Sequence, residues 1–140
     1  MYKILALSLF LTLIGCGEIS SPSNVYEEYN SQVINGISFE DEKKFYSTSK
    51  LAEVESSFPR YMAQMKKSKQ EVIKFYQDFS QSVAKCKSIK LIEEQKSDES
   101  VVLIYSQTDT CGNEGNGNEK QTVKMVNEGG WKIASVVVGF

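Results

Sequence analysis

The sequence predicts an α+β domain in which helices come first along the chain and an antiparallel β-sheet follows. Apolar residues recur with helical periodicity over residues 22–85, whereas β-prone runs separated by turn sequences fill residues 88–138. The two kinds of pattern do not alternate, so an α+β layer is expected rather than a parallel α/β fold.

The helical half begins with a clearly marked helix over Pro22–Asn35. Ser21 is suited to cap this helix, proline is favoured at its first position, and Gly36 is a natural stop. A second helical segment is expected over residues 39–46, because an acidic first turn and a basic second turn agree with the helix dipole.

Two longer helical segments follow. Residues 47–65 are expected to be helical with an interruption, because Pro59 cannot donate a helical hydrogen bond. The strongest helix covers Lys69–Lys85, and Ser68 and Glu71 fit a capping box at its start. Its apolar residues form one stripe that is expected to pack in the core: Val72, Phe75, Tyr76, Phe79 and Val83.

The second half of the domain reads as four strands. They are expected over residues 88–94, 101–105, 119–126 and 131–138. Polar or glycine-containing turns separate them at residues 95–99 and 127–130, and the glycine-rich segment 112–118 is a loop by composition.

The first residues of the chain do not read as part of this fold. Lys3 precedes an uncharged apolar run over residues 4–14, which is short for a membrane span but suits a signal peptide. The run ends in Leu13-Ile14-Gly15-Cys16, which resembles the lipobox of bacterial lipoproteins. That resemblance implies cleavage before Cys16 and lipid on its thiol, with several acyl chains giving stable anchoring. An uncleaved anchor and an ordinary secretory signal are the alternatives.

The lipobox divides the chain into three parts. Residues 1–15 are the expected signal peptide, residues 16–23 a lipidated tether, and residues 24–140 a single α+β domain. Position 17 is glycine rather than aspartate, and by resemblance to the sorting rule of Gram-negative bacteria this favours the outer membrane, with the domain facing the periplasm.

Two cysteines remain once Cys16 carries lipid. An exported protein folds in an oxidising compartment, so Cys86 and Cys111 are expected to pair. The chain-entropy model assigns a bridge across a loop of this length about 3 kcal/mol of stability. Two buried free thiols are the alternative.

Composition excludes several kinds of function. The sequence contains no histidine, the commonest general base and transition-metal ligand, and Arg60 is its one arginine. Cleavage before Cys16 would remove one of 16 basic side chains and none of 18 acidic ones, leaving a net charge of −3. Nucleic acid is therefore not an expected partner.

The order of elements and one motif point to a fold family. The segment Val126-Asn127-Glu128-Gly129-Gly130-Trp131-Lys132-Ile133 resembles the start of the last strand in small NTF2-like lipoproteins. That resemblance implies a cystatin-like cone, in which N-terminal helices pack on a curved antiparallel sheet. It implies little about function, because this fold hosts many unrelated activities.

Several carboxylates and tyrosines are candidate catalytic residues by type. Enzymes of this superfamily use carboxylates and tyrosines inside the cone, which here would draw on Asp41, Asp78 and Asp109 as bases and Tyr46, Tyr76 and Tyr105 as donors. Solvated carboxylates and core tyrosines are favoured, because no catalytic spacing links these residues. The loop from Asp109 to Glu119 does not fit an EF-hand, so no metal is expected.

Two apolar features admit a binding role. Trp131 is expected to close one end of the core, with a ligand-facing position as the alternative. The residues Phe58, Tyr61, Met62 and Met65 are expected in the core, with a groove for a partner as the alternative.

The leading hypothesis is a non-enzymatic, membrane-anchored lipoprotein that binds a protein partner or a small apolar ligand, with no cofactor. Its basis is an anchor, a tether and one compact domain without catalytic motifs. Two alternatives stay open: an immunity-type lipoprotein that neutralises a periplasmic toxin, and a cone-pocket enzyme. The enzyme hypothesis predicts a buried carboxylate–tyrosine pair in a cavity of several hundred Å³.

Overall fold

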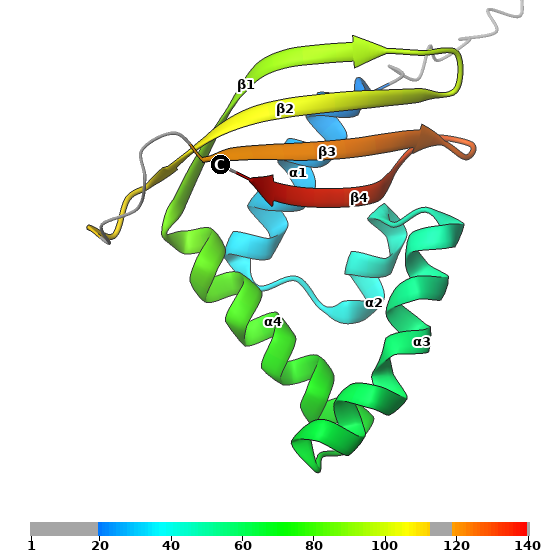
Figure 1. The fold of residues 1–140 in the computed structure, drawn as a ribbon, viewed down its shortest axis with the longest axis vertical. Helices are drawn as coiled ribbons and strands as arrows, with labels where there is room; N and C mark the ends of the chain where they lie inside the picture. Colours follow the sequence, from blue (N-terminus) through cyan, green and yellow to red (C-terminus); the bar gives the residue numbers. More distant parts are fainter. Residues whose placement is uncertain (1–19, 113–118, 140) are drawn as a thin grey trace, which may run out of the picture.

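The computed structural model describes residues 20–112 and 119–139, and these residues form the expected α+β architecture (Figure 1). The helices are α1 (Pro22–Asn35), α2 (Phe39–Glu42), the 3₁₀ helix η1 (Lys43–Phe45), α3 (Thr48–Met65) and α4 (Lys69–Lys85). The strands are β1 (Lys87–Lys96), β2 (Ser100–Asp109), β3 (Lys120–Asn127) and β4 (Trp131–Gly139). Cys16, the expected signal peptide and residues 113–118 lie outside the described residues.

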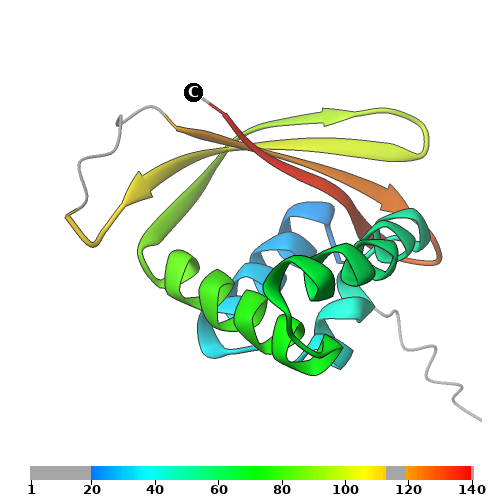
Figure 2. The same ribbon diagram turned by 60° about the horizontal axis from the view of Figure 1, so that its bottom comes forward.

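The sheet is antiparallel, with its strands in the order β1-β2-β3-β4. Every strand therefore pairs with its neighbours in sequence, which makes the sheet a meander. Figure 2 shows that the sheet is curved and that the helices lie on one side of it. The registers shift between Leu91 and Glu93 in β1 and between Lys124 and Met125 in β3. Such irregularities bend strands, which contributes to the curvature.

The core lies between α1 and the helix-facing side of the sheet. Tyr26 of α1 is buried, and its ring lies 5.4 Å from the ring of Tyr105 on β2. Alternate residues of β2 are buried, which is the period of a strand with one covered face. Trp131 packs against this core as a half-buried side chain, in agreement with its expected role.

Helix α1 begins two residues before residue 24, the expected start of the domain. The Ser21 hydroxyl accepts a hydrogen bond from the backbone N–H of Asn24 at 3.2 Å, and Pro22 takes the first helical position. The expected tether over residues 16–23 therefore overlaps the first turn of the domain.

Helices α3 and α4 form a V that projects away from the sheet (Figure 1). The start of α3 is fixed at the β4 edge, where the backbone N–H of Ser47 donates to the carbonyl of Ile133 at 2.9 Å. Glu128 in the β3–β4 turn accepts from the backbone and the hydroxyl of Thr48 at 2.9 and 2.8 Å. The other arm, α4, runs directly into β1, so the V is attached at both edges of the sheet.

The predicted interruption at Pro59 is wrong, because α3 runs unbroken through this residue. Pro59 is exposed, so its ring causes no clash in the interior of the domain. In the preceding turn, the hydroxyls of Ser56 and Ser57 donate to the carbonyls of Glu53 and Val54 at 2.9 and 2.7 Å. These bonds lie beside the carbonyl of Glu55, which loses its helical donor because Pro59 has no N–H.

The predicted disulfide is present and joins Cys86, the residue that ends α4, to Cys111 just beyond β2. The Cα atoms of the two cysteines lie 5.0 Å apart. The backbone N–H of Thr110 also donates to the carbonyl of Cys86 at 2.8 Å. The bridge therefore fixes the end of α4 to the first hairpin of the sheet.

Candidate functional site

The apolar stripe of α4 is exposed, which contradicts the prediction that it packs in the core. Val72 is fully buried, but Phe75, Phe79 and Val83 are 49%, 58% and 42% exposed. Tyr76 beside them is 37% exposed. Large apolar side chains of this size seldom lie together on a free surface, so the stripe is a candidate interaction surface.

The stripe is free because α4 docks through polar side chains. Gln77 donates from its amide to the carbonyl of Ile37 at 2.8 Å, and Gln81 donates to the carbonyl of Ile34 at 3.2 Å. Both acceptors lie at or just beyond the C-terminal end of α1, where carbonyls lack helical partners. These two glutamines orient α4 against α1 with its polar face, and the apolar face points elsewhere.

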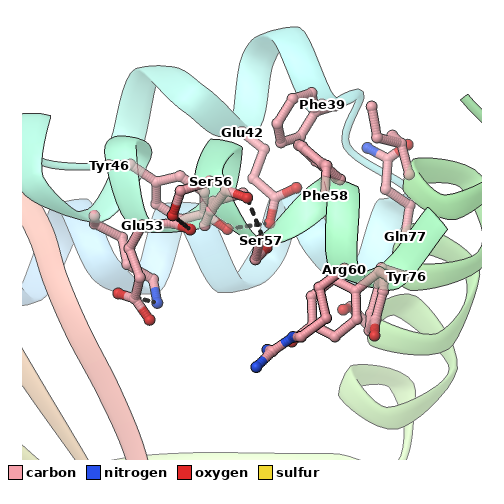
Figure 3. A pocket seen from close by; sticks show the side chains of 15 residues that line it. Phe39, Glu42, Tyr46, Glu53, Ser56, Ser57, Phe58, Arg60, Tyr76 and Gln77 are labelled. Carbon is pink, nitrogen blue, oxygen red and sulfur yellow. Dashed lines mark hydrogen bonds and ion pairs between the residues drawn. The ribbon is translucent and has the colours of Figure 1, made fainter. Parts of the chain in front are cut away.

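A groove of about 560 Å³ lies between α2, α3 and α4 (Figure 3). Its walls are aromatic. The rings of Phe39 and Phe58 meet edge to face with their centres 5.6 Å apart, and the ring centres of Tyr61 and Tyr76 lie 5.1 Å apart. Tyr76 belongs to both the groove and the α4 stripe, and its ring lies 5.6 Å from that of Phe75. The groove and the stripe therefore form one continuous surface.

A carboxylate with two tyrosine donors lies on the wall of the groove. The Tyr46 hydroxyl donates to Oε1 of Glu42 at 2.5 Å, and the Tyr29 hydroxyl donates to the same oxygen at 3.1 Å. Burial raises the pKa of both tyrosines above the usual range, and the negative charge of Glu42 adds to this effect. Both hydroxyls therefore stay protonated and continue to donate to Glu42.

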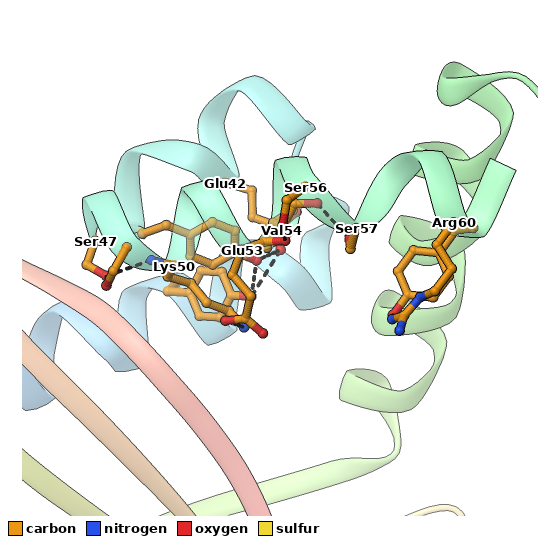
Figure 4. A network of polar contacts seen from close by, with 12 residues as sticks. Glu42, Ser47, Lys50, Glu53, Val54, Ser56, Ser57 and Arg60 are labelled. Carbon is orange, nitrogen blue, oxygen red and sulfur yellow. Dashed lines mark hydrogen bonds and ion pairs between the residues drawn. The ribbon is translucent and has the colours of Figure 1, made fainter.

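The other charges of the groove are already engaged (Figure 4). Lys50 and Glu53 form an ion pair at 3.2 Å along α3. Arg60 lies at the far end from Glu42, with its guanidinium 4.9 Å from the centre of the Tyr61 ring and 3.1 Å from the hydroxyl of Tyr61. Among the described residues, no lysine or arginine forms an ion pair with Glu42 within 4.0 Å.

The structure does not assemble the three aspartates that the sequence suggested as bases. Asp41 and Asp78 are exposed and form ion pairs with Lys44 and Lys74, which agrees with the favoured prediction of solvated carboxylates. Asp109 instead lies near the disulfide, where it accepts from the backbone N–H of Cys111 at 2.8 Å.

The three candidate tyrosines have different positions. Tyr46 lies in the groove as a donor to Glu42, and Tyr76 lines the groove without being buried in the core. Tyr105 is fully buried in the core. Phe58 is buried, as expected, although its side chain also lines the groove. Tyr61 lines the groove and is half-buried, as are Met62 and Met65.

Sequence reasoning missed Glu42 and Tyr29. The two residues are separated by 13 positions and lie on different helices, so no local spacing joins them. Glu42 also belongs to an acidic turn that reads as a solvated helix start. The available signal was that Glu42 and Tyr46 are four residues apart, which places side chains together on a helical segment.

Neither a metal site nor a membrane span is found in the part of the chain that the structure describes. Within residues 20–112 and 119–139, no three acidic, histidine or cysteine side chains converge as metal ligands. No helix in these ranges has the length and apolar character needed to cross a bilayer.

Comparison with known proteins gives a family but no activity. No curated protein and no solved structure shows a significant match to the chain. A family model described as a domain of unknown function, DUF5038, matches residues 21–129. The match begins at the cap of α1 and ends in the β3–β4 turn, so it covers the helices, the groove and most of the sheet. The chain therefore belongs to the DUF5038 family.

Proposed function

We propose that this protein is an exported, lipid-anchored and non-enzymatic domain that binds a protein partner through the apolar stripe of α4. The exposure of Phe75, Phe79 and Val83 along one helix carries this proposal. Burying a fully exposed phenylalanine or valine contributes about 1.5–3 kcal/mol, so covering the stripe offers several kcal/mol of gross binding energy.

The shape of the stripe favours a protein over a small ligand. Phe75, Phe79 and Val83 lie on the convex surface of a helix, which a small molecule cannot enclose. A partner with a complementary apolar groove covers such a helix face through anchors spaced by three or four residues. The adjoining groove at Tyr76 enlarges the same surface.

The expected lipid at Cys16 supports the location of this function. Few residues separate Cys16 from the start of α1 at Pro22, so an anchored domain would lie close to the membrane surface. The disulfide between Cys86 and Cys111 supports export, because such bonds persist in oxidising compartments. Radiolabelled palmitate incorporation that depends on Cys16 would test the anchor.

Site-specific photocrosslinking in living cells tests the partner. A photoreactive phenylalanine analogue at Phe79 is expected to join the full-length protein to one protein species. Ile92 on β1 is the matched control position, because it is also apolar and 50% exposed but lies outside the stripe. The variant Phe79→Asp is expected to abolish co-purification of the same species.

The identity and position dependence of the crosslinked species decide the outcome. A captured toxin of the cell envelope would make this an immunity-type lipoprotein, the specific form of the proposal suggested by its size and anchor. Equal crosslinking from Phe79 and Ile92, or crosslinking from Phe79 to lipid alone, would overturn the proposal.

A further inference from the structure

Glu42 is a half-buried carboxylate whose charge is not neutralised within the described part of the domain. Its side chain lines the groove, while the remaining acidic side chain of the groove, Glu53, is paired with Lys50. Removing a carboxylate from water is costly unless hydrogen bonds or a cation compensate for the lost hydration. Tyr29 and Tyr46 supply two hydrogen bonds, but neither supplies positive charge.

The two tyrosines leave half of the carboxylate open to a ligand. Both hydroxyls donate to Oε1 of Glu42, so Oε2 has no hydrogen-bond partner among the described residues. Figure 3 shows Glu42 on the wall of the groove, between Tyr46 and Phe58. A donor that binds Oε2 would therefore add to the two tyrosine hydrogen bonds rather than replace them.

The walls beside Glu42 suit the stem of a long basic side chain. Phe39, Phe58 and Tyr46 present aromatic surface, against which the methylene groups of lysine or arginine pack favourably. Aromatic faces also attract cations, and here Lys43 and Lys69 lie over the rings of Phe39 and Phe58 at 5.4 and 4.7 Å. Glu40 and Glu55 form ion pairs with these two lysines at 2.8 and 2.6 Å, so their positive charges are balanced and do not oppose a further cation at Glu42.

We propose that the groove receives a lysine or arginine side chain of the protein partner, with Oε2 of Glu42 as its acceptor. This inference rests on the proposed function for the source of the side chain. The connection is Tyr76, which belongs to both the stripe and the groove, so a partner covering Phe79 also reaches the groove entrance. Charge complementarity selects a basic anchor at Glu42, because this carboxylate has no ion-pair partner among the described residues, whereas Arg60 is engaged with the ring and hydroxyl of Tyr61.

A titration with small probes tests the chemistry without knowledge of the partner. The full chain in non-ionic detergent is titrated separately with the N-acetyl methylamides of lysine, arginine, norleucine and glutamate. The side-chain carboxyl carbon of Glu42 is followed by ¹³C NMR in each titration. The probes are used up to roughly 100 mM, a range that detects weak contacts of a single side chain. The lysine and arginine probes are expected to shift this signal saturably, whereas the norleucine and glutamate analogues are not.

Two variants locate the acceptor. Glu42→Gln is expected to weaken lysine-probe binding at least tenfold, because the charge-assisted hydrogen bond is lost while the side-chain shape is kept. Glu93→Gln is the matched control and is expected to leave binding unchanged, because Glu93 is an exposed carboxylate on β1 that does not line the groove. The wild-type signal of Glu42 keeps the test decisive even if Glu42→Gln does not fold.

Each contrary result overturns the inference. Saturable binding of the glutamate probe instead would identify Arg60 as the anchor, and equal binding of norleucine would make the groove a purely apolar site. No shift with the lysine probe would exclude Glu42 as an acceptor. Crosslinking from Phe79 is an independent test. If crosslinking succeeds but the lysine probe does not bind, only the inference about Glu42 is overturned. If the lysine probe binds but crosslinking fails, the proposed protein partner is overturned.

Discussion

The exposure of the α4 stripe predicts that valine-to-alanine substitutions at two positions of this helix lower the free energy of unfolding by different amounts. Val72→Ala deletes two buried carbon atoms, worth about 1.6 kcal/mol at about 0.8 kcal/mol for each. The residual cavity raises the expected loss of unfolding free energy to about 2–3 kcal/mol. Val83 is 42% exposed, so the same deletion there removes only part of this contribution. Alanine also has a higher helix propensity than valine, which offsets part of the remaining loss. Val83→Ala is therefore expected to lower the free energy of unfolding by less than about 1 kcal/mol.

Urea unfolding followed by circular dichroism measures both costs. The two valines lie on the same helix and lose the same atoms, so each variant is the control for the other. Phe79→Ala extends the comparison, and its expected cost is also about 1 kcal/mol or less, because that side chain is 58% exposed. A cost for Val83→Ala equal to that for Val72→Ala would show that the stripe is packed in the folded protein. The argument for a docking surface on α4 would then fail.

Three further predictions concern the disulfide, the cap of α4 and the buried tyrosines. Replacing Cys86 and Cys111 together with serine is expected to lower the unfolding free energy by about 3 kcal/mol, measured against the oxidised protein. Ser68→Ala is expected to cost about 1 kcal/mol in the same assay, because it removes the acceptor of the capping box. Burial raises the pKa of Tyr29 and Tyr46 in the folded protein. Their contribution to the free energy of unfolding is therefore fully present below the ordinary tyrosine pKa of 10.0 and is lost as the pH rises above it. Absorbance at 295 nm should therefore show tyrosines that ionise only when the protein unfolds, and complete ionisation in the folded state would contradict this.

The sequence predicted the parts of the fold that local signals determine. Ser21 and Gly36 set both ends of α1, and the cap at Ser68 set the start of α4. The disulfide was predicted because two cysteines remain once Cys16 is assigned to lipid and because export would place them in an oxidising compartment, and the structure joins Cys86 to Cys111. Each of these signals acts over a few residues or through a single covalent constraint.

The sequence did not predict the features that depend on how the helices are placed. Periodicity identifies an apolar face but does not identify the surface that covers it, so the α4 stripe was wrongly assigned to the core. The cluster of Tyr29, Glu42 and Tyr46 forms only when α1 packs beside the α2–η1 segment. The groove likewise depends on the angle between α3 and α4, which no local pattern specifies.

The composition of α4 explains how its apolar face can remain uncovered in a stable domain. Its start is held by the reciprocal capping bonds of Ser68 and Glu71, and Lys74 and Asp78 form an ion pair one turn apart. Gln77 and Gln81 attach the helix to α1, and the disulfide at Cys86 fixes its end. These interactions supply helix formation and orientation without using the phenylalanines. Since folding does not require the stripe to be buried, a partner can bury it, and the binding energy of that burial has not already been spent on the fold.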